Sequence, residues 1–166
     1  PVSQVEVRYG NYPFTAGENS TGQQAIGIQA ISYCPMPSLS VVKSSAPYAT
    51  VATDPNRFAI PGADILYTLT VSNSNSSPVD AGSVILTDPL PSTLEFYNGD
   101  IDDGGPLATN FEFVAGTSGL TFSASNLAYS NTNGASYAYS PAVGYDAAVN
   151  AIRLSPQGTM APNSSF

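Results

Sequence analysis

The amino-acid sequence predicts an all-β fold, and three observations carry the prediction. Apolar and polar residues alternate with the two-residue period of a β-strand in several short stretches, and no stretch shows a helical stripe. Turn residues separate these stretches at intervals of roughly 8–12 residues, which is typical of a sandwich or a barrel. The 14 prolines and 14 glycines are spread through the intervening segments, where such folds need turns.

The stretch 65–72 shows the strand pattern most clearly. Ile65, Tyr67, Leu69 and Val71 point to one face, while the residues between them are mostly polar. We therefore expect one face to pack on a core and the other to meet solvent. Pro61-Gly62 before the stretch is a turn signal. Further strands are expected, in chain order, at 38–43, 83–87, 94–97, 110–114, 120–125, 136–140 and 148–154.

Residues 1–37 are expected to form an N-terminal arm outside the main domain at 38–166. The arm holds two extended segments with apolar residues, which are Val5, Val7 and Tyr9 in the first and Ile26, Ile28 and Ile31 in the second. Pro35-Met36-Pro37 then interrupts the chain, because proline donates no hydrogen bond to a strand ladder. The boundary between arm and domain is placed there.

Charge and histidine content exclude several classes of function. The formal net charge is −8 with only four cationic residues, so the chain lacks the clustered cations that bind nucleic-acid phosphates or anionic membrane surfaces. No apolar run reaches the roughly 20 residues of a membrane span. The chain has no histidine, which removes Ser-His and Cys-His nucleophile pairs and the usual general base near neutral pH. We expect a protein that is not an enzyme, needs no cofactor, binds no nucleic acid and does not insert into a membrane.

Surface composition and the single cysteine bear on location. Only 10% of the residues are charged, so the polar surface must be built from hydroxyl and amide side chains, as in many exported β proteins. The sequence starts at Pro1, as a processed chain does, and an extracellular or cell-surface location is expected. Cys34 has no partner for an intrachain disulfide. It is interpreted as a small buried hydrophobe, with an intermolecular disulfide or a lipid attachment as alternatives.

From Leu39 onward the chain resembles a conserved-repeat family of bacterial and archaeal surface proteins, catalogued as domain of unknown function eleven. The matching segments, in chain order, are LSVVK at 39–43, IPGAD at 60–64, YTLTVSN at 67–73, TDPLP at 87–91 and GTMAP at 158–162. The resemblance implies an immunoglobulin-like β-sandwich on a cell surface. It implies no catalytic residues, since the family has no shared activity.

The resemblance also implies a last strand after the GTMAP turn, and that strand is expected to begin near Phe166. A sandwich without this strand has an unpaired edge and an open apolar groove. A strand from the arm of another copy can complete such a groove. The sequence therefore predicts a structural subunit of a pilus-like extracellular filament or surface assembly, which polymerises head-to-tail with other copies of itself. The predicted subunit contacts are Val5, Val7, Tyr9, Ile26, Ile28, Ile31 and Phe166.

Other arrangements stay open at this point. The last strand can follow the printed sequence, or the arm can fold back onto its own domain. The alternative function is an adhesin-type binding module of a larger surface protein that recognises a glycan or a protein. For that function Tyr129, Tyr137, Tyr139 and Tyr145 offer rings that stack on sugars, although tyrosines also suit packing and interfaces.

Acidic residues supply the remaining candidate sites. Asp100, Asp102 and Asp103 lie in a glycine-bearing loop and can offer oxygen ligands to calcium, or they form a solvated acidic turn. Asp88 is expected to accept backbone N–H groups in the TDPLP turn. A hydrolase needs two placed carboxylates, and no motif selects a pair from Glu95, Glu112 and Asp146.

Overall fold

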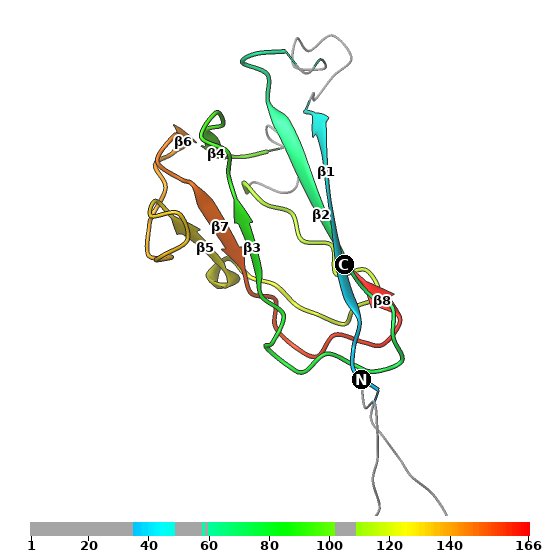
Figure 1. The fold of residues 1–166 in the computed structure, drawn as a ribbon. Coiled ribbons are helices and arrows are strands. Elements are labelled where there is room, and N and C mark those ends of the chain that lie inside the picture. Colours follow the sequence, from blue (N-terminus) through cyan, green and yellow to red (C-terminus); the bar gives the residue numbers. More distant parts are fainter. Residues whose placement is uncertain (1–34, 49–57, 59, 102–108) are drawn as a thin grey trace, which may run out of the picture.

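The computed structural model describes residues 35–48, 58, 60–101 and 109–166, and within these ranges the regular structure is almost entirely β-strand (Figure 1). The one described helix is a short 3-10 turn, η2, at Ala124–Asn126. The strands are β1 (Leu39–Pro47), β2 (Ile65–Asn73), β3 (Leu86–Pro89), β4 (Phe96–Asn98), β5 (Leu127–Ser130), β6 (Gly144–Asp146), β7 (Ala151–Leu154) and β8 (Ser164–Ser165).

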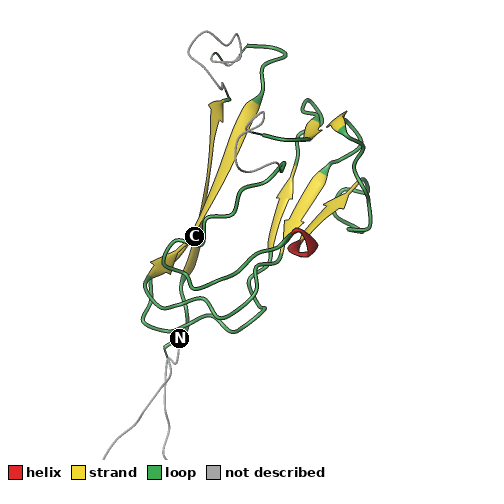
Figure 2. Cartoon of the chain, turned by 180° about the vertical axis from the view of Figure 1, so that it is seen from behind, coloured by secondary structure: helices red, strands yellow, loops and turns green. Residues whose placement is uncertain are grey.

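All described strand pairs are antiparallel and form three small sheets. The first has the order β1-β2-β8, the second β3-β7-β5, and the third pairs β4 with β6. The β1–β2 hairpin and the β3-β7-β5 sheet stand apart at one end and are joined by loops at the other (Figure 2). The all-β prediction is confirmed, and an immunoglobulin-like arrangement of the sheets stays a prediction.

A proline-glycine turn leads into β2, as its sequence indicates. Gly62 has a φ of 87°, and the Ala63 N–H donates to the Ile60 carbonyl at 3.0 Å. Proline followed by a glycine with positive φ is the signature of a type II turn. β1 then pairs along the whole of β2, with Leu39 opposite Asn73 and Pro47 opposite Ile65.

The buried core lies at the joined end of the molecule. It consists of Val71, Val79, Val84, Leu120 and Met160, with Leu86, Phe113 and Phe166 packed against it. We call this region the closed end. Loops supply most of the buried core side chains, which is why strand periodicity alone does not predict the set.

The Asn73 side chain holds the loops of the closed end together. It is 1% exposed, and its amide donates to the carbonyls of Ser77 at 2.7 Å and Ala161 at 3.2 Å. Its side-chain oxygen accepts the backbone N–H groups of Ser38 and Asn75. One side chain thus binds the start of β1, the end of β2 and the chain before β8.

The predicted strands at 38–43, 65–72, 83–87, 94–97 and 148–154 all overlap observed strands. Three predicted strands are wrong within the described residues. The 120–125 stretch forms one bridge at Thr121 and then enters η2, because the Asn126 side chain accepts the Ser123 N–H at 2.9 Å and bends the backbone. The 136–140 stretch makes only the bridge between Tyr139 and Tyr129.

The third wrong prediction, at 110–114, has a different cause. Phe111 and Phe113 are half-buried while Glu112 and Val114 are exposed, so the alternation of a strand is present. Among the residues that the structure describes, however, no strand lies in ladder register with this segment. β5 and β6 were not predicted, because three or four residues are too few to show a period, and β8 lies where the resemblance places the start of the last strand.

Candidate functional site

A large open groove lies at the end of the molecule opposite the closed end. Its volume is about 1510 Å³, and its lining extends from β2 to β3, β4 and the segment 110–116. The lining is mainly apolar and includes Leu69, Leu86, Leu94, Phe111, Phe122 and Ile152. We call this cavity the groove and the part of the molecule around it the open end.

One wall of the groove is an unpaired edge of β2. Val71 and Phe166 exchange backbone hydrogen bonds in both directions, at 2.9 and 3.0 Å. Because N–H and C=O groups point to alternate sides along a strand, the backbone groups of Leu69, Tyr67 and Ile65 face the same side as those of Val71. In the described parts of the chain no strand pairs with β2 on that side between Ile65 and Thr70.

The opposite wall is the segment 111–116. The Thr117 N–H donates to the Ser165 carbonyl at 3.0 Å, so β8 lies between β2 and this segment. The Phe166 ring packs on Phe113, with ring centroids 5.6 Å apart. A strand that extends the line of β8 past Phe166 would therefore have β2 on one side and 111–116 on the other. We call this strand position, which no described strand occupies, the slot.

The inward face of β2 shows that its apolar side chains are incompletely covered. Val71 is 1% exposed at the closed end, whereas Tyr67, which points to the same face, is 41% exposed. Four residues along a strand separate these side chains by about 13 Å, and Leu69, between them on the same face, is half-buried. The cover over this face therefore decreases from the core toward the groove.

A charged pair crosses from one sheet to the other beside the groove. The Lys43 ammonium of β1 donates to both carboxylate oxygens of Asp88 in β3, at 2.6 and 2.8 Å. The same ammonium lies 4.5 Å from the centre of the Tyr67 ring. Asp88 thus sits in a strand and accepts from a lysine side chain, which corrects the expectation that it accepts turn N–H groups.

Further carboxylates line the groove. They are Asp64, Glu95, Asp100 and Glu112, in addition to Asp88. The Asp64 carboxylate accepts a hydrogen bond from the Tyr145 hydroxyl at 2.6 Å, and this bond raises the pKa of Tyr145 to about 12. Lys43 is the one cation among the described lining residues, so the electrostatic potential of the lining is negative.

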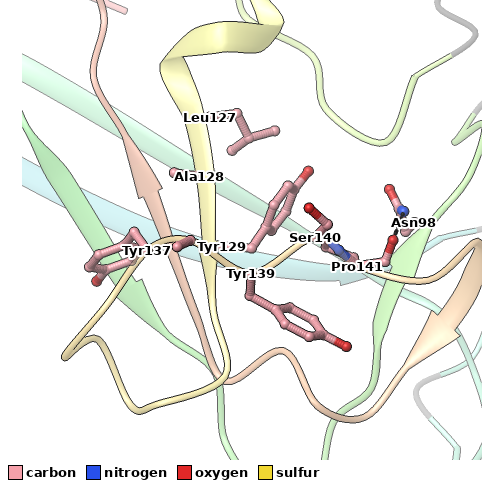
Figure 3. Close-up of a pocket in the computed structure, with 9 residues that line it drawn as sticks. Asn98, Leu127, Ala128, Tyr129, Tyr137, Tyr139, Ser140 and Pro141 are labelled. Carbon is pink, nitrogen blue, oxygen red and sulfur yellow. Dashed lines mark hydrogen bonds between the residues drawn. The ribbon is translucent and has the colours of Figure 1, made fainter.

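The tyrosine-rich region forms a separate shallow pocket of about 420 Å³ (Figure 3). Tyr129, Tyr137 and Tyr139 line it, but the Tyr137 ring points away from the other two. Tyr137 instead packs against Arg153, whose guanidinium carbon lies 4.6 Å from the ring centre. The Tyr145 ring packs against Tyr97 in a tilted arrangement, with ring centroids 5.0 Å apart and an interplanar angle of 50°. The four predicted tyrosines therefore do not form one flat platform for a sugar.

Polar groups in the tyrosine pocket are occupied by internal hydrogen bonds. Asn98 donates to the carbonyls of Pro141 and Ala142, at 3.1 and 3.0 Å (Figure 3 labels Asn98 and Pro141). Its side-chain oxygen accepts from Asn110 at 2.6 Å, and Asn110 also donates to the Tyr129 hydroxyl. Burial raises the pKa of Tyr129, against the opposing effect of the Asn110 hydrogen bond. These hydrogen bonds connect neighbouring loops and strands of the molecule, and they leave few polar groups in the pocket to bind a ligand.

Asp146 is also committed to internal partners. Its carboxylate accepts from the N–H groups of Ala142 and Ala148 and from the Tyr139 hydroxyl, at 2.8 to 2.9 Å. The two backbone donors, and to a lesser extent Tyr139, lower the pKa of Asp146, while burial acts in the opposite direction. A carboxylate held by three donors in this way orders a turn, and nothing in the contacts selects it as one of a catalytic pair.

Several predicted site residues lie outside the described residues. They are Val5, Val7, Tyr9, Ile26, Ile28, Ile31, Cys34, Asp102 and Asp103. Phe166 is described, and it lies at the start of the slot. Across the described ranges no group of three or more histidine, cysteine, aspartate or glutamate side chains is arranged to hold a metal ion. The predicted calcium loop falls largely outside those ranges.

The comparisons with known proteins give no relative. No family model, no curated protein and no solved structure matches the chain. No helix in the described residues has the length and apolar character needed to cross a membrane.

Sequence reasoning missed two features of the site. Lys43 and Asp88 each lie in a predicted strand or family-like segment, but the period of a strand does not show which strands face each other. Asn110 was placed at the start of a predicted strand and Asn98 in an acidic loop, and neither position indicates that the two amides are hydrogen-bonded to each other. The rarity of cations was the available signal for Lys43, since a lone lysine among many acids is expected to have a carboxylate partner.

Proposed function

We propose that the protein is a structural subunit of an extracellular, pilus-like filament, and that it polymerises head-to-tail when the N-terminal arm of one copy fills the groove of the next. The observation that carries the proposal is the slot, an unpaired edge of β2 beside an apolar groove. Exposed strand edges of this kind are sites for strand addition.

The slot offers both backbone and side-chain interactions to an incoming strand. Ile65, Tyr67 and Leu69 present three N–H and three C=O groups, and each ladder hydrogen bond formed contributes about 0.5–1.5 kcal/mol. Each apolar side chain buried in the groove adds about 1.5–3 kcal/mol. These terms oppose the entropy that is lost on association and on ordering a strand of the arm.

The position of the arm supports a head-to-tail contact. The Asn75 side chain donates to the Met36 carbonyl at 2.6 Å, so the chain joins the domain at the closed end. The groove lies at the open end. The point where the arm joins the domain and the groove are thus at opposite ends of one copy. A heterologous contact of this kind produces an open filament unless the rotation closes a ring.

The alternative function is a glycan- or protein-binding module of a surface protein. The tyrosine pocket is the observation in its favour. Its polar groups are largely engaged by internal partners, and its rings do not share one plane. We therefore rank strand exchange above glycan binding.

Negative-stain electron microscopy and sedimentation of the purified 166-residue chain test the proposal. The proposal predicts regular fibres at high protein concentration, which a peptide of residues 1–34 shortens by competing for grooves. A chain that stays monomeric at every concentration, with its groove closed by its own residues, would contradict it.

A further inference from the structure

The length of chain between the domain and each extended segment of the arm distinguishes the two segments, and we infer that the donor strand lies in the second segment, at residues 25–30. This inference rests on the proposed function. It uses the place where the arm joins the domain, the length of chain between that point and each segment, and the direction of the slot. Residues 1–34 lie outside the described part of the structure.

The direction of the incoming strand follows from β8. β8 and Phe166 run antiparallel to β2, and the slot continues their line toward Ile65. Antiparallel pairing is also slightly more stable per residue than parallel pairing. The occupant therefore enters with its N-terminal side near Val71 and leaves the groove at the Ile65 end.

The pattern of the slot defines three inward positions, opposite Leu69, Tyr67 and Ile65. Residues opposite Thr70, Thr68 and Leu66 face outward, because side chains alternate along a strand. The second segment places Ile26, Ile28 and Ala30 in the three inward positions, with Ile28 opposite Tyr67. The first segment offers Val5, Val7 and Tyr9 at the same spacing. The side-chain pattern alone does not separate the two.

Tether length separates them. The chain is fixed at Met36 beside Asn75, and Ala30 precedes Met36 by six residues, so the tether spans at most about 20–22 Å. Within one copy, the slot position opposite Ile65 lies at least about 27 Å from Asn73, given about 3.4 Å for each residue of β2. The second segment therefore falls short of the groove of its own copy in this direction. As an antiparallel strand it can fill only the groove of another copy.

The first segment lacks this restriction. Tyr9 precedes Met36 by 27 residues, and the intervening chain extends to about 90 Å. A segment on so long a tether can reach the groove of its own copy, and self-filling is then favoured by its high effective concentration. A short tether favours polymerisation because it prevents the segment from filling the groove of its own copy, and of the two segments only the second has a short tether.

Two charge substitutions in the full chain form a matched test. Ile28→Asp places a carboxylate in the acidic groove opposite Tyr67 and is expected to lower the fibre fraction in sedimentation at least tenfold. Val7→Asp is the control, and we expect wild-type fibres. Loss of fibres with Val7→Asp but not with Ile28→Asp would overturn the assignment while leaving the proposed function standing. If neither substitution changes fibres that do form, the arm is not the donor and both proposals fail.

Lengthening the tether gives a second, independent readout. Insertion of twelve Gly-Ser residues between Tyr33 and Cys34 allows residues 25–30 to reach their own groove. The expected product is a monomer with a higher Tm than the Ile28→Asp variant, because its groove is filled. Undiminished fibre length after the insertion would contradict the tether argument.

Disulfide trapping identifies the contact directly. Two chains in a Cys34→Ser background, one with Ile28→Cys and the other with Tyr67→Cys, are mixed and oxidised. Directly opposite residues of a ladder lie about 5.5 Å apart at Cα, within the range of a disulfide. A cross-linked heterodimer is expected, and a Val7→Cys chain mixed with the Tyr67→Cys chain serves as the control. Cross-linking by the control alone would assign the groove to the first segment.

Discussion

The two ends of the inward face of β2 have the same sequence pattern and different surroundings. At the closed end Val71 is 1% exposed and packs in a core that includes Met160 and Leu120. At the open end Tyr67 is 41% exposed and faces the groove. The difference shows that alternation specifies which face of a strand is apolar, while the neighbouring strands decide whether that face is covered. In this protein the uncovered half is the feature that we connect to function.

The largest effect is expected at the closed end, from Met160→Ala. Met160 is 0% exposed in the core, and truncation leaves a cavity. Loss of a buried side chain of this size lowers the free energy of unfolding by about 2–5 kcal/mol. Urea unfolding measures the change, and Met36→Ala, at a 67% exposed methionine, is the matched control. Equal losses for both variants would mean that the closed end is not the core.

The next effect concerns the hydrogen bonds of Asn73. Asn73→Ala removes a side chain that satisfies two carbonyls and two N–H groups. Each buried group left without a partner costs about 1–3 kcal/mol. Urea unfolding should show a loss of that size, with Asn131→Ala, at an exposed residue, nearly neutral. A loss below about 0.5 kcal/mol would indicate that water replaces the amide.

A smaller effect on stability is expected at the open end, from Tyr67→Ala. This substitution removes a half-exposed ring and its contact with Lys43, which contributes about 0.5–1 kcal/mol at such sites. The change in free energy of unfolding of the monomer should therefore stay near 1 kcal/mol. Assembly, in contrast, should need a clearly higher protein concentration, because the centre of the slot loses its apolar wall. Assembly of the variant at the wild-type concentration would show that polymerisation does not depend on the groove.

The smallest effect is a pH dependence from Asp146. Its pKa is lowered in the folded state by hydrogen bonds from Ala142, Ala148 and Tyr139, so ionised Asp146 stabilises the fold. This stabilisation is complete above the ordinary aspartate pKa of about 4 and is lost as the pH falls through the lower folded-state value. Asp146→Asn should flatten the fall of Tm between pH 5 and pH 2 by a small amount. An unchanged fall of Tm over this pH range in the variant would show that ionised Asp146 does not stabilise the fold.

The fold was predictable from sequence where the pattern was long. Ile65–Asn73 shows nine residues of alternation after a Pro-Gly turn, and both features are present. The strand at 120–125 was wrong because a serine and an asparagine side chain compete with the ladder for the backbone. β8 was too short to show any period, although it positions the slot.

The site was predictable only in outline. An unpaired edge and an apolar groove were expected if the last strand is missing; β2 has an unpaired stretch beside an apolar groove in the described residues, and the missing strand itself stays a prediction. The ion pair between Lys43 and Asp88 and the amide network of Asn98 and Asn110 depend on which strands face each other. Local periodicity contains no information on that point. The predicted arm contacts lie outside the described residues and stay predictions.

Hydrogen exchange of individual β2 amides tests the central claim most directly. The N–H groups of Leu69, Tyr67 and Ile65 face the slot, whereas those of Thr70, Thr68 and Leu66 bond to β1 and serve as internal controls. We predict that the first three exchange quickly in dilute monomer and slowly in assembled protein, while the other three are protected in both. Protection of all six amides in the monomer would show that the slot is already filled, and it would contradict this account.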